Sequence, residues 1–282
     1  MTGFIIVNKQ VGVSSAREVA IIKRLSGVSC GHMGTLDPLA SGVLPVAVGN
    51  ATRLFDYFLD KKKTYIATFK FGVSSDTLDI SGQVINSGER VPEREEIEKV
   101  IPSLCGEVMQ VPPNYSAKNI NGVRGYQLAR QGVQFTLPPK KVNIYSIKLL
   151  DKTKSDSFSF EIECGGGTYI RSIARDMAKL LQTSAIMSSL VRTKSGVFDI
   201  ERSVKSDELN YENFSNYLIA TDSVLQLDAI YASTNEEKRL FNGLSVPTDK
   251  KDGIYKLYKP EGSFYGLAEV KQSILKVRTK LC

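Results

Sequence analysis

The stretch CGHMGTLDPLASGVLPVAVG at residues 30–49 joins a glycine-rich loop to a short apolar run. Its glycines permit backbone turns that a side chain would hinder. Pro38 fixes its own φ and biases Asp37 towards an extended conformation. Residues 43–48 are mostly apolar and predict a buried strand, although an apolar run of this length also fits a buried helix. The pattern therefore predicts a stiffened loop that carries Asp37 on a packed base.

The residues of this loop alone leave two interpretations open. An Asp before Pro is commonly a turn residue, and a lone histidine beside a glycine, such as His32, is commonly a structural residue. Loops held by a rigid scaffold, however, often carry catalytic groups. Asp37 is thus a candidate for catalysis as well as for a turn.

Length and composition limit the class of protein. The 282 residues suffice for one large core and a smaller domain. The chain is 42% hydrophobic and 24% charged, which is typical of a folded globular protein and argues against overall disorder. Its 37 lysines and arginines exceed its 30 acids, so the net charge is +7. This surplus favours polyanionic partners such as nucleic acid.

Other patterns argue against several classes. The four cysteines form no CxxC pair and the chain has one histidine, so no metal site is expected. The glycine turn at residues 165–167 is followed by neither GK[ST] nor Rossmann spacing, so no nucleotide cofactor is expected. No apolar stretch approaches the roughly 20 residues that cross a bilayer, and the N-terminal run is too short for a signal peptide. We expect a cytoplasmic protein.

Periodicity along the chain predicts alternating strands and helices. Ser15 and Glu18 have the spacing of a capping box, which predicts the start of a helix. Residues 52–59 have the pattern of a short amphipathic helix. Residues 64–72 alternate and predict a strand, in which Tyr65 is either a core aromatic or a functional one. These elements indicate an α+β or mixed α/β fold.

Residues 31–44, GHMGTLDPLASGVL, closely resemble the GHxGxLDPxAxGxL signature of the pseudouridine synthases that act on uridine 55 in the T-loop of tRNA, the TruB family. Separated blocks between about residues 3 and 200 resemble other segments of the family. The resemblance implies isomerisation of uridine to pseudouridine, with the target nucleotide flipped out of its stack. Reactant and product contain the same atoms, so the implied reaction needs no cofactor and no metal.

The resemblance also implies catalytic roles. Asp37 is the nucleophile or the carboxylate that assists glycosidic cleavage, and Arg171, in the segment GTYIR, is its ionic partner. An arginine near a helix N-terminus is mildly unfavourable, and a carboxylate partner would explain its presence there. Tyr65, in the segment KTYIA, is expected to stack on the target base and to take part in deprotonation at C5.

Substrate contacts are implied for three further residues. These are Tyr169 in the GTYIR segment, Leu190 in a segment similar to LxRxxxGxF, and His32 in the signature itself. A uridine in the folded T-loop must be extruded, which costs roughly a few kcal/mol of stacking. His32 is expected to fill the vacated position as a flat wedge.

Two more segments resemble family blocks. Residues 111–130 interleave bases and aromatics, which suits phosphate attraction and base stacking but also occurs on ordinary helical surfaces. In this segment Asn119 takes the usual lysine position and Lys118 precedes it. A polar turn contains Asp76 and Asp79, which fit either a carboxylate pair or, as we expect, hydrogen bonding within the turn.

The resemblance implies a pseudouridine-synthase-type α+β fold, with a central, mostly antiparallel sheet flanked by helices. Residues 1–224 are predicted to form the catalytic domain. From about residue 225 short apolar runs alternate with Gly, Pro and Lys, and residues 225–282 are predicted to form a small β-rich PUA-like domain that binds RNA. Within it, residues 249–282 hold eight bases and four acids, a surplus of 8 − 4 = +4. A basic subdomain without RNA-binding function is the alternative.

Two other functions are compatible with these features. One is a tRNA-binding or tRNA-folding helper whose pocket is secondary, and the other is a guide-dependent synthase that acts on ribosomal RNA within a protein complex. The set of Asp37, Tyr65 and Arg171 argues against a purely binding role. The short C-terminal region favours a stand-alone enzyme, so we expect a monomer that acts on the T-stem-loop of tRNA.

Overall fold

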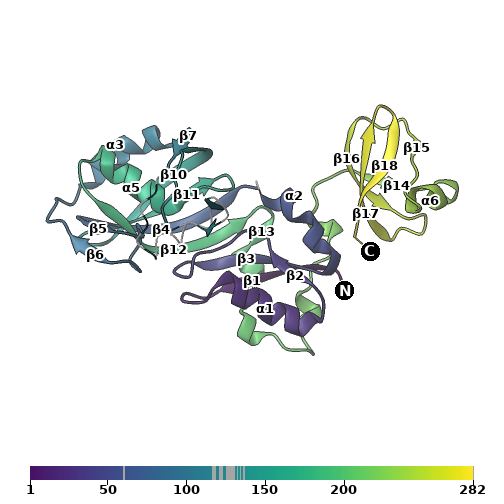
Figure 1. Cartoon of the computed structure of the whole chain (residues 1–282), viewed down its shortest axis with the longest axis horizontal. Coiled ribbons are helices and arrows are strands. Elements are labelled where there is room, and N and C mark those ends of the chain that lie inside the picture. The colour runs from purple at the N-terminus through teal and green to yellow at the C-terminus, as the bar shows by residue number, and fades with distance from the viewer. Residues whose placement is uncertain are drawn as a thin grey trace.

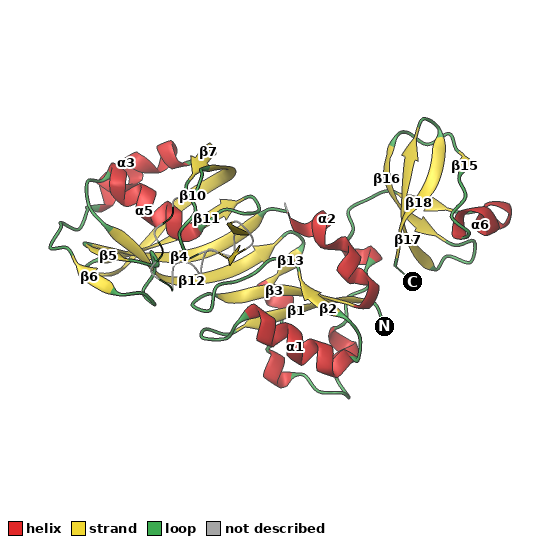
Figure 2. Cartoon of the chain, viewed as in Figure 1, coloured by secondary structure: helices red, strands yellow, loops and turns green. Residues whose placement is uncertain are grey.

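The computed structural model describes residues 1–59, 61–115, 119–120, 123–124, 131, 133, 135 and 137–281. Within these residues the chain forms two large sheets, two small hairpins and five α-helices (Figures 1 and 2). No described helix is long and apolar enough to span a membrane. The helices are α1 (Ser15–Ser26), α2 (Phe55–Leu59), α3 (Arg94–Leu104), α5 (Ile170–Leu180) and α6 (Thr234–Phe241).

The larger sheet is central to the molecule and mostly antiparallel. Among the described strands, only β3 and β12 pair in parallel within this sheet. Two short strands attach at its sides, β2 (Cys30–His32) on β3 and β13 (Phe198–Asp199) on β12. The spatial order of the other strands is β1 (Gly3–Lys9), β3 (Ser41–Val48), β12 (Ala185–Ser195), β4 (Lys63–Phe71), β11 (Ser157–Cys164), β10 (Lys140–Lys154) and β7 (Gly106–Gln110).

The middle strands have a side-chain pattern that explains the core. Along β4 the side chains alternate between buried and half-buried positions, as the sequence predicted. Its buried residues join one hydrophobic cluster with residues of α1, α3 and α5, for example Ile22, Ile97 and Ile173. Helices α3 and α5 lie together over one part of the sheet, and α1 lies beside β1 and β3 (Figure 2). The fold class expected from the sequence is confirmed.

A second lobe follows near the C-terminus and is drawn in yellow and light green in Figure 1. Phe4 of β1 belongs to the same apolar cluster as Leu267 and Leu281, and Arg53 Nη1 donates to the Lys280 carbonyl at 2.9 Å, so the lobe contacts the rest of the chain. Its strands in spatial order are β14 (Ala229–Tyr231), β16 (Gly253–Tyr258), β17 (Phe264–Lys271), β18 (Ile274–Lys280) and β15 (Val246–Pro247).

Two short hairpins complete the described strands. The first pairs β5 (Val73–Ser75) with β6 (Val84–Asn86) and encloses the polar turn that contains Asp76 and Asp79. The second pairs β8 (Asn119–Ile120) with β9 (Val123–Arg124), inside the segment expected to face the substrate. Lys118 of that segment lies outside the described residues.

The predicted capping box at the start of α1 is wrong. Ser14 is the N-cap, and its hydroxyl accepts a hydrogen bond from the backbone N–H of Arg17. Ser15 lies within the first turn and is buried. Its hydroxyl donates to the carbonyl of Leu36 at 2.9 Å and accepts from the N–H of Leu36 at 3.0 Å. Ser15 therefore connects α1 to the loop that carries Asp37.

Candidate active site

Asp37 lies in the loop between β2 and β3. Gly34 begins this loop with φ = +131°, a conformation that glycine tolerates because it has no Cβ. The N–H of Ala40 donates to the carbonyl of Asp37 at 3.0 Å and closes a turn around Pro38. The side chain of Asp37 keeps 40% of its accessible surface. Its carboxylate is therefore fixed by its backbone yet open to a ligand.

Arg171 makes the ion pair with Asp37 that the family resemblance implied. It lies in the first turn of α5, and its Nη2 is 2.8 Å from Asp37 Oδ2 while only 6% of its side chain is exposed. The same guanidinium donates to the carbonyls of Thr77 at 3.0 Å and Tyr115 at 3.1 Å. A charge-assisted bond to a guanidinium held in this way restricts the direction of the carboxylate.

Asp79 is a third member of this ion-pair group, and sequence reasoning missed that role. Its Oδ2 lies 3.4 Å from Arg171 Nη1 and its side chain is 5% exposed. Its Oδ1 accepts hydrogen bonds from Thr77 Oγ1 and from the hydroxyl and N–H of Ser81. The expected turn hydrogen bonding is thus confirmed. The ion pair with Arg171, 92 positions later, has no signal in the spacing of the turn.

Two buried polar residues, Lys9 and Ser15, hold the Asp37 loop through its backbone. Lys9 is fully buried, and its Nζ donates to the carbonyls of Ala40 at 2.6 Å and Pro38 at 3.4 Å. Burial lowers the pKa of Lys9 from its ordinary value, while the nearby charges of Glu18 and Asp37 oppose this effect. Together with Ser15, Lys9 anchors the loop on both sides of Asp37.

Tyr65 and Leu190 lie next to this loop in the hydrophobic core. Both are 7% exposed, and they share one cluster with Leu36 of the loop and Ile170 of α5. Burial raises the pKa of the Tyr65 phenol, the positive charge of Arg192 opposes this, and the charge of Asp37 adds to it. The structure therefore brings Asp37, Tyr65 and Arg171 into one neighbourhood.

The other two predicted contacts flank this group. His32 ends β2, and its Nδ1 is buried with no hydrogen-bond partner among the described residues. Burial, followed by the charge of Arg192, lowers the pKa of His32 below its ordinary value of 6.5. Tyr169 precedes α5, and its backbone N–H and carbonyl bond the side-chain amide of Gln110 at 2.8 and 3.1 Å. Its position is therefore fixed by its backbone.

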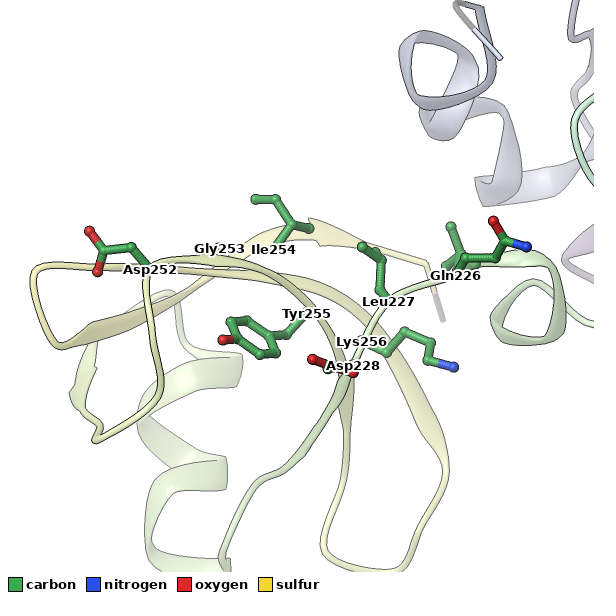
Figure 3. A pocket seen from close by; sticks show the side chains of 9 residues that line it. Gln226, Leu227, Asp228, Asp252, Gly253, Ile254, Tyr255 and Lys256 are labelled. Carbon is green, nitrogen blue, oxygen red and sulfur yellow. The ribbon is translucent and has the colours of Figure 1, made fainter. Parts of the chain in front are cut away.

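The cavity at the second lobe lies away from the predicted site residues, and the described residues form no cluster of metal ligands. A cavity of about 580 Å³ lies at the second lobe, lined by residues 225–228 and 252–256 (Figure 3). Its lining residues belong to the segment before β14, to β16 and to Asp252 just before β16, and none of the six predicted site residues lines it. In the part of the chain that is described, no three His, Cys, Asp or Glu residues cluster as a metal site would require.

Comparisons with known proteins agree with this geometry. The model of the TruB family pseudouridylate synthase, N-terminal domain, matches residues 23–170. The chain is 37% identical over 289 residues to tRNA pseudouridine synthase B of Clostridium novyi (strain NT), covering 100% of both chains. It is also 37% identical over 277 residues to tRNA pseudouridine synthase B of Francisella philomiragia subsp. philomiragia, covering 95% of this chain and 91% of that protein.

Solved structures share the fold. A Cbf5-Nop10-Gar1 complex contains a chain that matches with a TM-score of 0.73 and 23% identity, over 99% of this chain and 85% of that one. An H/ACA RNP bound to a substrate RNA containing 2′-deoxyuridine contains a match with a TM-score of 0.72 and 21% identity, over the same shares. The fold and the ion-paired carboxylate thus define an enzyme of the pseudouridylate synthase class. More narrowly, since the family model covers over half of its length, the chain belongs to the TruB family.

Replacement of Asp79 tests whether its charge supports Arg171. In Asp79→Asn the side chain keeps its shape, but a buried guanidinium loses one of its two carboxylates. We expect the free energy of unfolding, measured by urea denaturation, to fall by about 3 kcal/mol, since removal of one partner of a buried ion pair has this cost. Asp76→Asn is the matched control, because Asp76 is exposed and accepts one bond from the Gln83 N–H. Equal losses in the two variants would contradict this role.

The lowered pKa of His32 predicts a pH dependence of stability. Well above pH 6.5 the imidazole is neutral in both the folded and the unfolded state and contributes no pH dependence. As the pH falls below 6.5, the unfolded chain binds the proton first, so the folded wild type loses stability until its own lower pKa is passed. Urea denaturation from pH 5 to 8 should show this loss in the wild type relative to His32→Gln. Parallel curves for both proteins would exclude the effect.

Proposed function

We propose that the chain isomerises uridine to pseudouridine at position 55 in the T-loop of tRNA, with Asp37 as the essential carboxylate. The observation that carries this proposal is the 2.8 Å ion pair between Asp37 and the buried Arg171. An exposed aspartate needs no such partner for solubility, whereas an aspartate that must meet a sugar carbon in one orientation does. The names of the relatives agree with tRNA as the substrate.

The chemistry requires one bond to be exchanged for another. The bond between C1′ and N1 breaks, the uracil turns, a bond between C1′ and C5 forms, and the proton on C5 is replaced by one on N1. Asp37 is proposed to act on the sugar or the base as nucleophile, or to assist elimination at the sugar. The side chain of Asp37 is 40% exposed and so remains open to a ligand, while the side chain of Arg171 that pairs with it is only 6% exposed.

Tyr65 is proposed to lie against the target base and to take part in the transfer of the C5 proton. Its raised pKa keeps it a neutral phenol at physiological pH, so its resting role is to pack against the base. Acceptance of a proton requires the phenolate, and the adjacent positive charge of Arg192 favours that form.

His32, Tyr169 and Leu190 are proposed to contact the substrate. The lowered pKa of His32 keeps its imidazole neutral at pH 7, and a neutral flat ring is suited to fill the position that an extruded base leaves. Leu190 offers an apolar surface beside Tyr65, which would exclude water from the detached uracil.

We further propose that residues 1–224 form the catalytic domain and residues 225–282 a PUA-like RNA-binding domain. The five-stranded sheet and the local charge of 8 − 4 = +4 in residues 249–282 support this division. The stand-alone mode implies a monomer that acts without a guide, and the cytoplasm is where its tRNA substrate would be met. A guide-dependent synthase within a complex would instead be inactive as a purified single chain.

Asp37→Asn tests the proposed function. On a T-stem-loop RNA, the purified wild type should form pseudouridine, detected by mass spectrometry, while Asp37→Asn should lose roughly 10⁴-fold or more in rate, as expected for loss of an essential catalytic group. RNA binding should be retained. Asp56→Asn, which neutralises an exposed acid on α2, is the control and should keep wild-type activity.

The outcomes separate the alternatives. Failure of the wild type on the bare stem-loop, with activity only in the presence of added proteins and guide RNA, would favour the guide-dependent synthase. An Asp37→Asn protein that forms pseudouridine at the wild-type rate would show that Asp37 is not the essential group. An Asp37→Asn protein without pseudouridine formation that still provides the full benefit of the protein to tRNA in cells would favour the helper role.

A further inference from the structure

Arg192 on β12 is a buried cation that the proposed chemistry does not explain. It is 1% exposed and is the largest of the fully buried side chains. None of the ion pairs among the described residues includes it. A charge in the interior is costly unless its hydrogen-bonding capacity is used. The hydrogen-bond acceptors of its guanidinium therefore indicate the role of Arg192.

The guanidinium of Arg192 bonds the backbone on both sides of Asp37, at the start of its loop and in β3, where the loop ends. Its Nη2 donates to the Gly34 carbonyl at 3.0 Å and its Nη1 lies 3.5 Å from the Thr35 carbonyl, before Asp37. Its Nε donates to the Val43 carbonyl at 2.7 Å, after Asp37. One rigid planar group thus sets the separation between the two ends of the loop. A lysine carries all of its donors on one nitrogen and cannot bond carbonyls on both sides of the loop in this way.

The backbone brings Arg192 close enough for these bonds. Arg192 is the parallel partner of Gly42 where β12 meets β3. Gly42 has φ = +96°, and an added Cβ there would clash with the Arg192 carbonyl oxygen. Only glycine fits this approach. The backbones of Gly42 and Arg192 therefore pack directly against each other, with no space between them for a side chain at position 42.

Arg192 also faces the second proposed catalytic residue. It is the antiparallel partner of Tyr65 where β12 pairs with β4. Its charge and hydrogen bonding lower the pKa of the Tyr65 phenol against the larger effect of burial, and its charge also lowers the pKa of His32. The guanidinium thus lies near Tyr65 and His32 and bonds the backbone on either side of Asp37, although the side chain is too deeply buried to contact RNA itself.

We propose that Arg192 is a positioning residue for the isomerisation, whose guanidinium joins the two ends of the Asp37 loop to the strand that faces Tyr65. This role rests on the proposed function of Asp37 and Tyr65. Its effect is on distance and direction, because a displacement of about 1 Å of a reacting group lowers a rate by about 100-fold. The loop would still form without Arg192, held by Lys9 and Ser15, but with its aspartate less well placed.

Variants of Arg192 test this role by separating rate from binding. In Arg192→Met the single-turnover rate on a T-stem-loop should fall about 100-fold, while the dissociation constant for RNA changes by less than about threefold. Arg192→Lys keeps the charge but cannot join both loop ends, so its rate should fall by about 10-fold or more. Ile186→Ala is the matched control, since Ile186 is fully buried in the same strand, pairs with Lys70 of β4, and has an apolar side chain that cannot donate a hydrogen bond to the loop. It should lower the melting temperature but not the rate of the folded enzyme.

The pH dependence of the single-turnover rate distinguishes a positioning role from a general loss of stability, because loss of stability alone would not shift it. Because Tyr65 accepts a proton only as the phenolate, the rate should rise with pH as Tyr65 ionises. Loss of the charge in Arg192→Met should move this rise to higher pH, because the pKa of Tyr65 increases, whereas Arg192→Lys should leave it in place. Rates within threefold of Ile186→Ala for both variants, or a loss confined to RNA binding, would overturn the proposal. If Arg192→Met does not fold, the rate of Arg192→Lys decides. An active Asp37→Asn would instead refute the proposed function.

Discussion

The site depends on one guanidinium held between two carboxylates of different exposure. Arg171 pairs with Asp79, which is buried, and with Asp37, which is 40% exposed. Two negative charges meet one positive charge, so the group keeps a net charge of −1. Because Asp79 is also bonded by hydroxyls and an N–H, it stays with Arg171. The guanidinium can therefore aim Asp37 without fully neutralising it, as a carboxylate that attacks or assists must remain an anion.

This arrangement requires distant parts of the chain to meet, and the central sheet brings them together. The loop of Asp37 connects β2 to β3, Arg171 lies in the first turn of α5, and Asp79 lies in the turn between β5 and β6. Strand β12 pairs with both β3 and β4 and so carries Arg192 between the loop and Tyr65. Buried Lys9 and Ser15 add bonds to the loop backbone. Four buried polar residues, Lys9, Ser15, Arg171 and Arg192, therefore bond Asp37 or the backbone beside it.

The parts of this account that a sequence could predict are those with a local signal. The alternation along β4 and the glycine-rich loop follow from periodicity and turn chemistry. The pairing of Asp37 with Arg171 was expected only from the resemblance to the TruB family, and the catalytic roles remain proposals. The ion pair of Asp79, the bond of Ser15 to Leu36 and the burial of Arg192 were not predicted. Each depends on tertiary contacts between residues far apart in the chain, and their local patterns favour caps, turns or surface charges instead.

The most direct measurement is a crystal structure of the wild-type chain bound to a T-stem-loop RNA that carries pseudouridine at position 55. The product cannot turn over further in the forward direction, so the catalytic groups stay intact. The account predicts that nucleotide 55 is out of its stack, that its C1′ lies about 3.5 Å from a carboxylate oxygen of Asp37, and that the Asp37 to Arg171 pair persists. The account would be contradicted if nucleotide 55 remained stacked within the T-loop. It would also be contradicted if the nucleotide bound elsewhere and made no contact with Asp37.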